Sequence, residues 1–313
     1  MAEVDPDMAR ILALLAGQEL APLETMAPAE ARAEAEFRNR FWNEGSPAVA
    51  RVEERLLPGP RRPLRLRVYT PKGAATPGPG LLYVHGGGWV ICSLDTHDGV
   101  CRRIANAAGQ RVLSLDYGLA PEEPFPAGLE DVVAAHEWLR SEGADLGVDP
   151  ERLAVGGDSA GANLALAACL GLRNRGRPLP RAAVLIYGVY SADDDSPSHR
   201  AYGGGEWFLS TATMRWFWDH YVPDPERRRD PLAAPLYADL SGLPPLYVSA
   251  AALDPLLDDT ERLVERLRAA GADVEPHVWP GVTHACIMMS RLLPAADRQI
   301  AEVGDFLRRR LGE

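Results

Sequence analysis

One short stretch limits the folds open to this chain, because an apolar strand pattern turns through glycines directly into an Ala/Leu-rich helix pattern. Residues 153–155 end the strand, and Gly157-Asp158-Ser159-Ala160-Gly161 follows. Glycines two residues before and after the serine remove Cβ atoms that would clash where strand and helix approach. In this context the pattern G-x-S-x-G predicts a strained turn that exposes the Ser159 hydroxyl at a helix N-terminus. A glycine-rich turn with an incidental serine is the alternative, and the strand-turn-helix context favours a nucleophile.

Apolar strand patterns alternate with helical patterns through most of the chain. We expect strands at residues 52–57, 64–69, 81–85, 111–116, 153–155, 183–187, 246–253 and 274–279. We expect helices at residues 8–18, 27–42, 98–108, 128–142, 159–173, 211–221, 258–270 and 291–311. Short apolar strands separated by helices indicate an α/β fold with a parallel sheet that is covered on both faces.

Residues 191–230 interrupt this alternation. No strand pattern appears there, and aromatic residues are dense, including Trp207, Phe208 and the run at 216–218. Such density argues against a purely solvated insertion. We therefore expect this segment to fold back over the site together with the N-terminal helices, and we expect Trp207 and Phe208 to line a substrate pocket.

Composition excludes several classes of protein. The formal net charge of −11 argues against nucleic acid or an anionic membrane surface as a partner. No apolar run reaches the ~20 residues of a membrane span, and no basic segment precedes the short apolar run near the N-terminus, so we expect no signal peptide. Four cysteines without a C-x-x-C pair favour a reducing, cytoplasmic setting over a disulfide framework or a zinc site.

A second glycine cluster, His85-Gly86-Gly87-Gly88, comes directly after the strand expected at 81–85 and before Trp89. Consecutive glycines leave backbone N–H groups unshielded, so a small anionic atom can approach them closely. With the serine turn downstream, the cluster matches an oxyanion loop. We expect the N–H groups of Gly87, Gly88 and Ala160 to stabilise developing negative charge, with Trp89 beside them at the pocket and the histidine bracing the loop.

A nucleophilic serine needs a base, and the base needs an orienting acid. Of seven histidines, His284 lies in the loop after the last strand pattern, at the sheet edge where parallel strands end. Asp254 directly follows another strand pattern, whereas Asp258 and Asp259 begin a helix, where the helix dipole alone favours acids. The chain order Ser159, Asp254, His284 is that of Ser-acid-His hydrolases.

Taken together, these motifs resemble the hormone-sensitive-lipase family of bacterial carboxylesterases, within the α/β-hydrolase superfamily. Two further stretches carry the resemblance, Asp116–Glu122 and Asp254-Pro255-Leu256, so that it covers nearly the whole chain. It implies an eight-stranded, mostly parallel sheet whose second strand is antiparallel. It also implies a helical cap, formed by residues 1–45 and 191–230, over a catalytic domain formed by residues 46–190 and 231–313.

Three positions depart from the family pattern. Gly118 stands where arginine is usual, which predicts that a salt bridge is missing from that loop. Ala252-Leu253 precedes Asp254 where the family commonly has Glu-x, and Cys286 stands in a position that is often phenylalanine. None of the three removes a catalytic group, so we expect effects on the acyl pocket and on local stability.

The resemblance implies a serine carboxylesterase that acts on short-to-medium acyl esters through a Ser-His-Asp triad and an acyl-enzyme intermediate. No metal or organic cofactor is implied, the expected ligand is a small ester, and a homodimer remains open. An amidase or arylformamidase would have the same catalytic residues. A hormone receptor of this fold would lack the catalytic histidine, and the presence of His284 argues against it.

Overall fold

The computed structural model describes residues 3–18 and 21–312, and its centre is one eight-stranded sheet. The strands are β1 (Arg51–Leu57), β2 (Leu64–Thr70), β3 (Gly78–Val84), β4 (Arg111–Asp116), β5 (Val148–Asp158), β6 (Ala183–Ile186), β7 (Leu246–Leu253) and β8 (Val274–Thr283). Their order in the sheet is β1-β2-β4-β3-β5-β6-β7-β8. β2 runs antiparallel to β1 and β4, and the other pairs are parallel. The predicted sheet is confirmed, including its antiparallel second strand.

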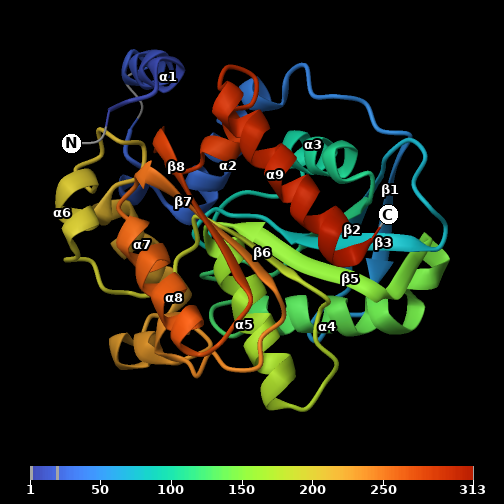
Figure 1. Ribbon diagram of the computed structural model, residues 1–313. Helices are drawn as coiled ribbons and strands as arrows, with labels where there is room; N and C mark the ends of the chain where they lie inside the picture. The colour runs from blue at the N-terminus through green and yellow to red at the C-terminus, as the bar shows by residue number, and fades with distance from the viewer. Residues whose placement is uncertain (1–2, 19–20, 313) are drawn as a thin grey trace.

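Helices cover both faces of the sheet (Figure 1). One face carries α3 (Asp98–Ala108) and α9 (Pro294–Leu311), and the other carries α4 (Ala127–Glu142), α5 (Ala160–Asn174) and α8 (Leu257–Ala269). Alternate residues of β3 point to opposite faces, so Leu81 and Tyr83 join the core beneath α3 and α9 while Leu82 and Val84 join the other core. All four side chains are fully buried, which explains why this strand reads as a continuous apolar run.

Two strands are longer than their apolar patterns predict. β5 begins at Val148, and β8 continues from Val274 to Thr283 although its apolar pattern suggests an end at Trp279. Pairing with a neighbour explains the extension of β8, because a register shift lets Leu253 of β7 pair with Thr283. This pairing carries the chain to the residue before His284.

Two segments outside the sheet contain the remaining helices. The first holds α1 (Pro6–Ala16), η1 (Leu23–Thr25) and α2 (Pro28–Asn43), and the second holds α6 (Pro197–Tyr202), α7 (Thr211–Tyr221) and η3 (Pro225–Arg229). Three more short helices are η2 (Gly143–Leu146), η4 (Pro235–Tyr237) and η5 (Cys286–Met289). Within the described ranges, no helix combines the length and the apolar run that a membrane crossing needs.

The two segments touch one another and the sheet. The Thr213 hydroxyl of α7 donates to Glu24 of η1 at 2.7 Å, and the Asp5 N–H donates to the Gly281 carbonyl of β8 at 3.0 Å. In Figure 1, α1 and α6 lie at the same end of the sheet, beside the ends of β7 and β8. Residues 1–2 and 19–20 of the predicted cap and residue 313 of the predicted catalytic domain lie outside the described residues. The division into cap and catalytic domain stays a prediction.

The two acids at the start of α8 do more than complement the helix dipole. Asp259 accepts the N–H groups of Tyr190 and Ser191, both at 2.8 Å, and Asp258 accepts the Ser198 N–H at 2.8 Å. Burial raises the pKa of Asp259 to about 7, although the two N–H groups act in the opposite direction. These acids therefore attach the start of the second segment to helix α8, which packs on the sheet.

Candidate active site

The turn between β5 and α5 is built around Ser159, whose backbone has φ 54° and ψ −122°. Residues other than glycine rarely adopt a positive φ, and such strain is concentrated at functional sites. The glycines on either side are required by close packing. A Cβ atom on Gly157 would lie 2.1 Å from the Val84 carbonyl oxygen, and one on Gly161 would lie 1.9 Å from it. The strained turn predicted from the sequence is present.

Ser159, His284 and Asp254 form a continuous hydrogen-bonded chain. His284 Nε2 lies 2.9 Å from Ser159 Oγ, and His284 Nδ1 lies 2.7 Å from Asp254 Oδ2. The other Asp254 oxygen accepts the Leu256 N–H at 2.9 Å. Because a carboxylate can only accept hydrogen bonds, Nδ1 carries the imidazole proton, which leaves the lone pair of Nε2 facing the serine hydroxyl. All three side chains are buried.

The sheet brings these three residues together from distant parts of the sequence. Ser159 follows β5, Asp254 follows β7 and His284 follows β8. These strands are parallel, so their carboxyl ends lie along one edge of the sheet. Directly after the histidine, Ala285 has φ 61°, which turns the chain into η5.

The glycine loop after β3 presents backbone donors to this site. Gly87 and Gly88 have φ 106° and 56°, and the N–H groups of Val90 and Ile91 both return to the Gly87 carbonyl at 3.0 and 2.9 Å. Among the described residues, the N–H groups of Gly87 and Gly88 meet no acceptor. Ala160 is the first residue of α5, so its N–H has no partner within the helix. A nucleophile beside a base and free N–H donors is an arrangement suited to acyl transfer.

Comparison with known proteins agrees with this geometry. Residues 81–288 match the profile of a family described as alpha/beta hydrolase fold. The chain belongs to this family. An ethyl acetate hydrolase from Pseudomonas putida is 34% identical over 320 residues, which cover 98% of this chain and 99% of that protein. An acetyl-hydrolase from Streptomyces hygroscopicus is 39% identical over 236 residues, covering 75% and 77%. The structure of a hyperthermophilic esterase from Pyrobaculum calidifontis superposes with a TM-score of 0.93 at 35% identity, covering 98% of each chain.

Within this alpha/beta hydrolase, the three predicted pocket residues have different surroundings. Trp89 is 1% exposed and stacks on Tyr221 with ring centroids 4.0 Å apart. Trp207 is half-buried and lies edge-on to Tyr202, whereas Phe208 is 46% exposed. Trp89 therefore packs in an aromatic cluster beside the glycine loop, and a pocket role for these three residues stays a prediction.

The sequence did not single out Phe217 or Tyr187. The ring of Phe217, on α7, fills the space beside Gly88, and the ring of Tyr187 lies 4.7 Å from that of His284. Tyr187 follows β6, so its position at a strand end was a usable signal. Phe217 belongs to the aromatic run 216–218, and nothing in that run indicates which ring faces the site.

Gly118 has no side chain and forms no salt bridge, but an arginine from another part of the chain supplies ion pairs beside this loop. Arg61, from the turn between β1 and β2, contacts the Asp131 carboxylate at 2.7 Å and Glu123 at 3.3 Å. Asp131 also accepts the Gly118 N–H at 2.8 Å. The Glu123 side chain fills the space that a side chain at Gly118 would need, because a Cβ atom there would lie 2.0 Å from Oε2.

The other two departures from the family pattern are packed inside the alpha/beta hydrolase. Leu253 is fully buried, and its pairing with Thr283 aligns the strand ends that carry Asp254 and His284. The Cys286 thiol is also buried, and burial raises its pKa far above the ordinary value. A thiol of this kind stays protonated and is a poor nucleophile.

Proposed function

We propose that this protein is a serine carboxylesterase that forms an acyl-enzyme on Ser159. The serine attacks the ester carbonyl while His284 Nε2 takes its proton, and Asp254 holds the imidazole and stabilises the imidazolium. The observation that carries the proposal is the pair of contacts made by His284, 2.9 Å to Ser159 Oγ and 2.7 Å to Asp254 Oδ2.

The oxyanion of the tetrahedral intermediate rests on the N–H groups of Gly87, Gly88 and Ala160. Each such donor acts where negative charge develops, and removing one costs about 3 kcal/mol of barrier in comparable enzymes. His284 next protonates the leaving alcohol, and the same imidazole then activates the water that releases the acid.

The protein is a carboxylic ester hydrolase, and the substrate proposal is narrower: short-to-medium acyl esters. Two relatives with high coverage are named ethyl acetate hydrolase and acetyl-hydrolase, which supports a short acyl group. Four free cysteines support a reducing, cytoplasmic setting as part of the same proposal.

A substrate panel tests the proposal. The wild-type protein and Ser159→Ala are assayed with p-nitrophenyl esters of increasing acyl length and with the matching p-nitroanilides. We expect the highest kcat/KM with short acyl esters, little turnover of the anilides and loss of both activities in the variant. Faster turnover of anilides would indicate an amidase, and no labelling of Ser159 by a fluorophosphonate would indicate a receptor.

The acyl-enzyme has its own test. Acetates with different leaving alcohols are hydrolysed in the presence of methanol, and the ratio of methyl acetate to acetic acid is measured. A common acyl-enzyme partitions between methanol and water after the alcohol has left, so we expect one ratio for all substrates. A ratio that changes with the leaving alcohol contradicts the intermediate.

A further inference from the structure

A buried polar cluster lies directly behind the oxyanion loop and outside the triad. Asp158, the residue before Ser159, accepts the Tyr83 hydroxyl at 2.7 Å and the Gly86 N–H at 3.1 Å on its Oδ1. His97, at the start of α3, places Nε2 3.3 Å from the same oxygen. His97 is 0% exposed and Asp158 is 2% exposed, so water does not compete for these contacts.

Asp158 is held as a carboxylate. Burial alone would raise its pKa, but the attraction of His97 and the hydrogen bonds from His97 and Tyr83 lower the pKa below its usual value. The imidazole nitrogen that faces this carboxylate must carry a proton. A buried carboxylate that loses one of its donors is left with uncompensated charge, so each donor constrains the cluster strongly.

Gly86 connects this cluster to the oxyanion donors. Its N–H is bound by Asp158, and the next two residues are Gly87 and Gly88. The carboxylate also packs against Gly86, because a Cβ atom there would lie 2.5 Å from Oδ2. Asp158 therefore fixes the orientation of the Gly86 peptide and its distance from the carboxylate, just before the N–H donors of Gly87 and Gly88. Asp158 is also the residue next to Ser159 in the chain.

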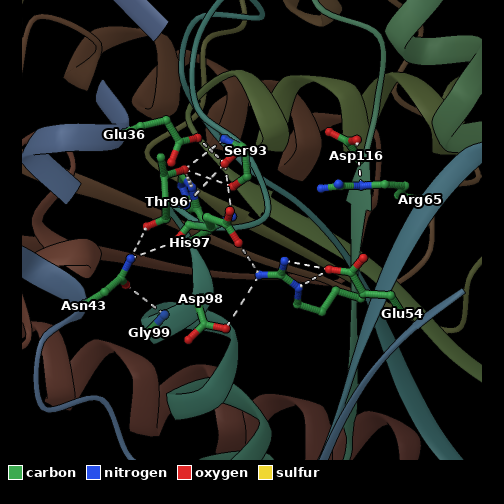
Figure 2. Close-up of polar contacts among 12 residues, drawn as sticks. Glu36, Asn43, Glu54, Arg65, Ser93, Thr96, His97, Asp98, Gly99 and Asp116 are labelled. Carbon is green, nitrogen blue, oxygen red and sulfur yellow. Dashed lines mark hydrogen bonds and ion pairs between the residues drawn. The ribbon is translucent and has the colours of Figure 1, made fainter. Parts of the chain in front are cut away.

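The turn at residues 93–97, which carries His97, is hydrogen-bonded to helix α2 (Figure 2). His97 Nδ1 lies 2.9 Å from Thr96 Oγ1, which accepts the Ser93 N–H at 2.9 Å, and the Ser93 hydroxyl donates to Glu36 of α2. Farther along the helix, Asn43 donates to the Thr96 carbonyl at 3.2 Å. The same Asn43 side chain accepts the N–H of Gly99, at the start of α3, at 2.9 Å. In Figure 2, Glu36 and Asn43 reach this turn from the same helix.

A third residue of α2 contacts the loop itself. Arg32 donates to the carbonyls of Val90 and Ala120, both at 2.8 Å. Val90 closes the turn that starts at Gly87. Arg32 and Glu36 are four residues apart, a spacing that places both on one face of the helix. One face of α2 therefore contacts Val90, at the end of the turn that begins at Gly87, and also Ser93.

We propose that His97 and Asp158 are positioning residues that hold the oxyanion loop against Ser159, with helix α2 supporting them through Thr96 and Ser93. This inference rests on the proposed function, since it takes the loop to bind an oxyanion. The pair touches no substrate, so its loss lowers the rate of the step in which the oxyanion develops and leaves substrate binding nearly unchanged. A misplacement on the order of 1 Å can cost roughly 100-fold in rate.

Four variants of the full-length protein test the role. His97→Leu removes a donor to Asp158, and His97→Gln returns an N–H to the position of Nε2. Tyr83→Phe removes the second side-chain donor. Tyr247→Phe is the matched control, because this tyrosine is also buried in the sheet but its hydroxyl donates to Glu302 on α9. The measurements are kcat and KM with p-nitrophenyl acetate, the affinity for a trifluoromethyl ketone, and amide hydrogen exchange at residues 86–88.

We expect Tyr83→Phe and His97→Leu to lower kcat by about 10- to 100-fold and to leave KM within about threefold of the wild type. The affinity for the trifluoromethyl ketone should fall by a factor similar to that for kcat. His97→Gln should recover most of the loss, and Tyr247→Phe should resemble the wild type. Should His97→Leu fail to fold, Tyr83→Phe decides. Folded variants that keep kcat within twofold, or that lose no more than the control, overturn the proposal.

Hydrogen exchange separates this inference from the proposed function. If the wild-type protein hydrolyses no ester, the proposed function fails while the positioning role is still decided at residues 86–88. Faster exchange there in Tyr83→Phe supports the role, and unchanged exchange overturns it.

Discussion

Phe217 of α7 lies directly against Gly88 of the glycine loop after β3: a Cβ atom added to Gly88 would stand 2.1 Å from the Phe217 ring. The ring is 5% exposed, and its helix also contacts the N-terminal segment through Thr213 and Glu24. A bulky side chain from the second segment therefore adjoins the place where the substrate carbonyl is proposed to bind. This contact limits the space beside the proposed oxyanion donors.

The first prediction concerns acyl-chain length. Phe217→Ala should raise kcat/KM for octanoate relative to acetate by about 10-fold or more, because a pocket methylene contributes about 1 kcal/mol or somewhat more. Trp207→Ala tests the expectation from the sequence in the same assay. Phe41→Ala, on the exposed part of α2, is the control and should leave the profile unchanged. An unaltered profile in Phe217→Ala would show that this ring does not limit the substrate.

The second prediction concerns the nucleophile. Ser159→Ala should lower kcat by roughly 10⁴-fold or more while the protein stays folded, since the variant lacks the hydroxyl that we propose forms the acyl-enzyme. The melting temperature should not fall, because the change removes only the Oγ atom from the packing and leaves the backbone, with its φ of 54°, as it is. Residual activity within tenfold of the wild type would exclude Ser159 as the nucleophile.

The third prediction separates two neighbouring acids. Asp254→Asn should cost on the order of 10³ to 10⁴ in kcat, because an amide cannot stabilise the imidazolium or fix its tautomer. Asp259→Asn is the matched control, since its amide oxygen can still accept the N–H groups of Tyr190 and Ser191. It should cost about tenfold at most. If the two results were exchanged, the assignment of the orienting acid would be wrong.

The fourth prediction concerns the pH dependence of stability. Burial raises the pKa of Asp259 to about 7 from an ordinary value of 3.8. The raised pKa favours the protonated form of Asp259 in the folded state. Its contribution to the free energy of unfolding is therefore fully present below about pH 4 and is lost as the pH rises through 7. Asp259→Asn does not titrate. Its melting temperature should therefore rise relative to the wild type between pH 5 and pH 8, by about 2 °C or more.

Calorimetry at constant ionic strength checks the fourth prediction. The difference in melting temperature between Asp259→Asn and the wild type is measured at several pH values. A difference that stays constant across this range would show that Asp259 is ionised in the fold throughout.

Much of the site follows from local sequence. The glycines around Ser159 indicate a turn with no space for side chains. The same requirement holds wherever a helix begins directly after a strand and packs this close to it. Asp254 and His284 each follow a strand, and parallel strands end along one edge, so their meeting could be predicted without knowing the packing. Strand ends were less predictable, as β8 shows, because its last residues pair only through the register shift at Leu253.

The sequence by itself therefore determined the alternation of strands and helices along the chain and the candidate residues Ser159, Asp254 and His284, since each depends on a pattern within a few positions. The eight-stranded sheet with its antiparallel second strand was implied by the family resemblance. Only the tertiary structure decided that Arg61 supplies the ion pairs beside Gly118, that Phe217 rather than Trp216 faces the oxyanion loop, and that His97 meets Asp158. The physical reason is that such contacts join segments distant in sequence. Each depends on the rotation of a helix about its axis and on the depth of its packing, and a periodic apolar pattern specifies which face is buried without specifying the partner.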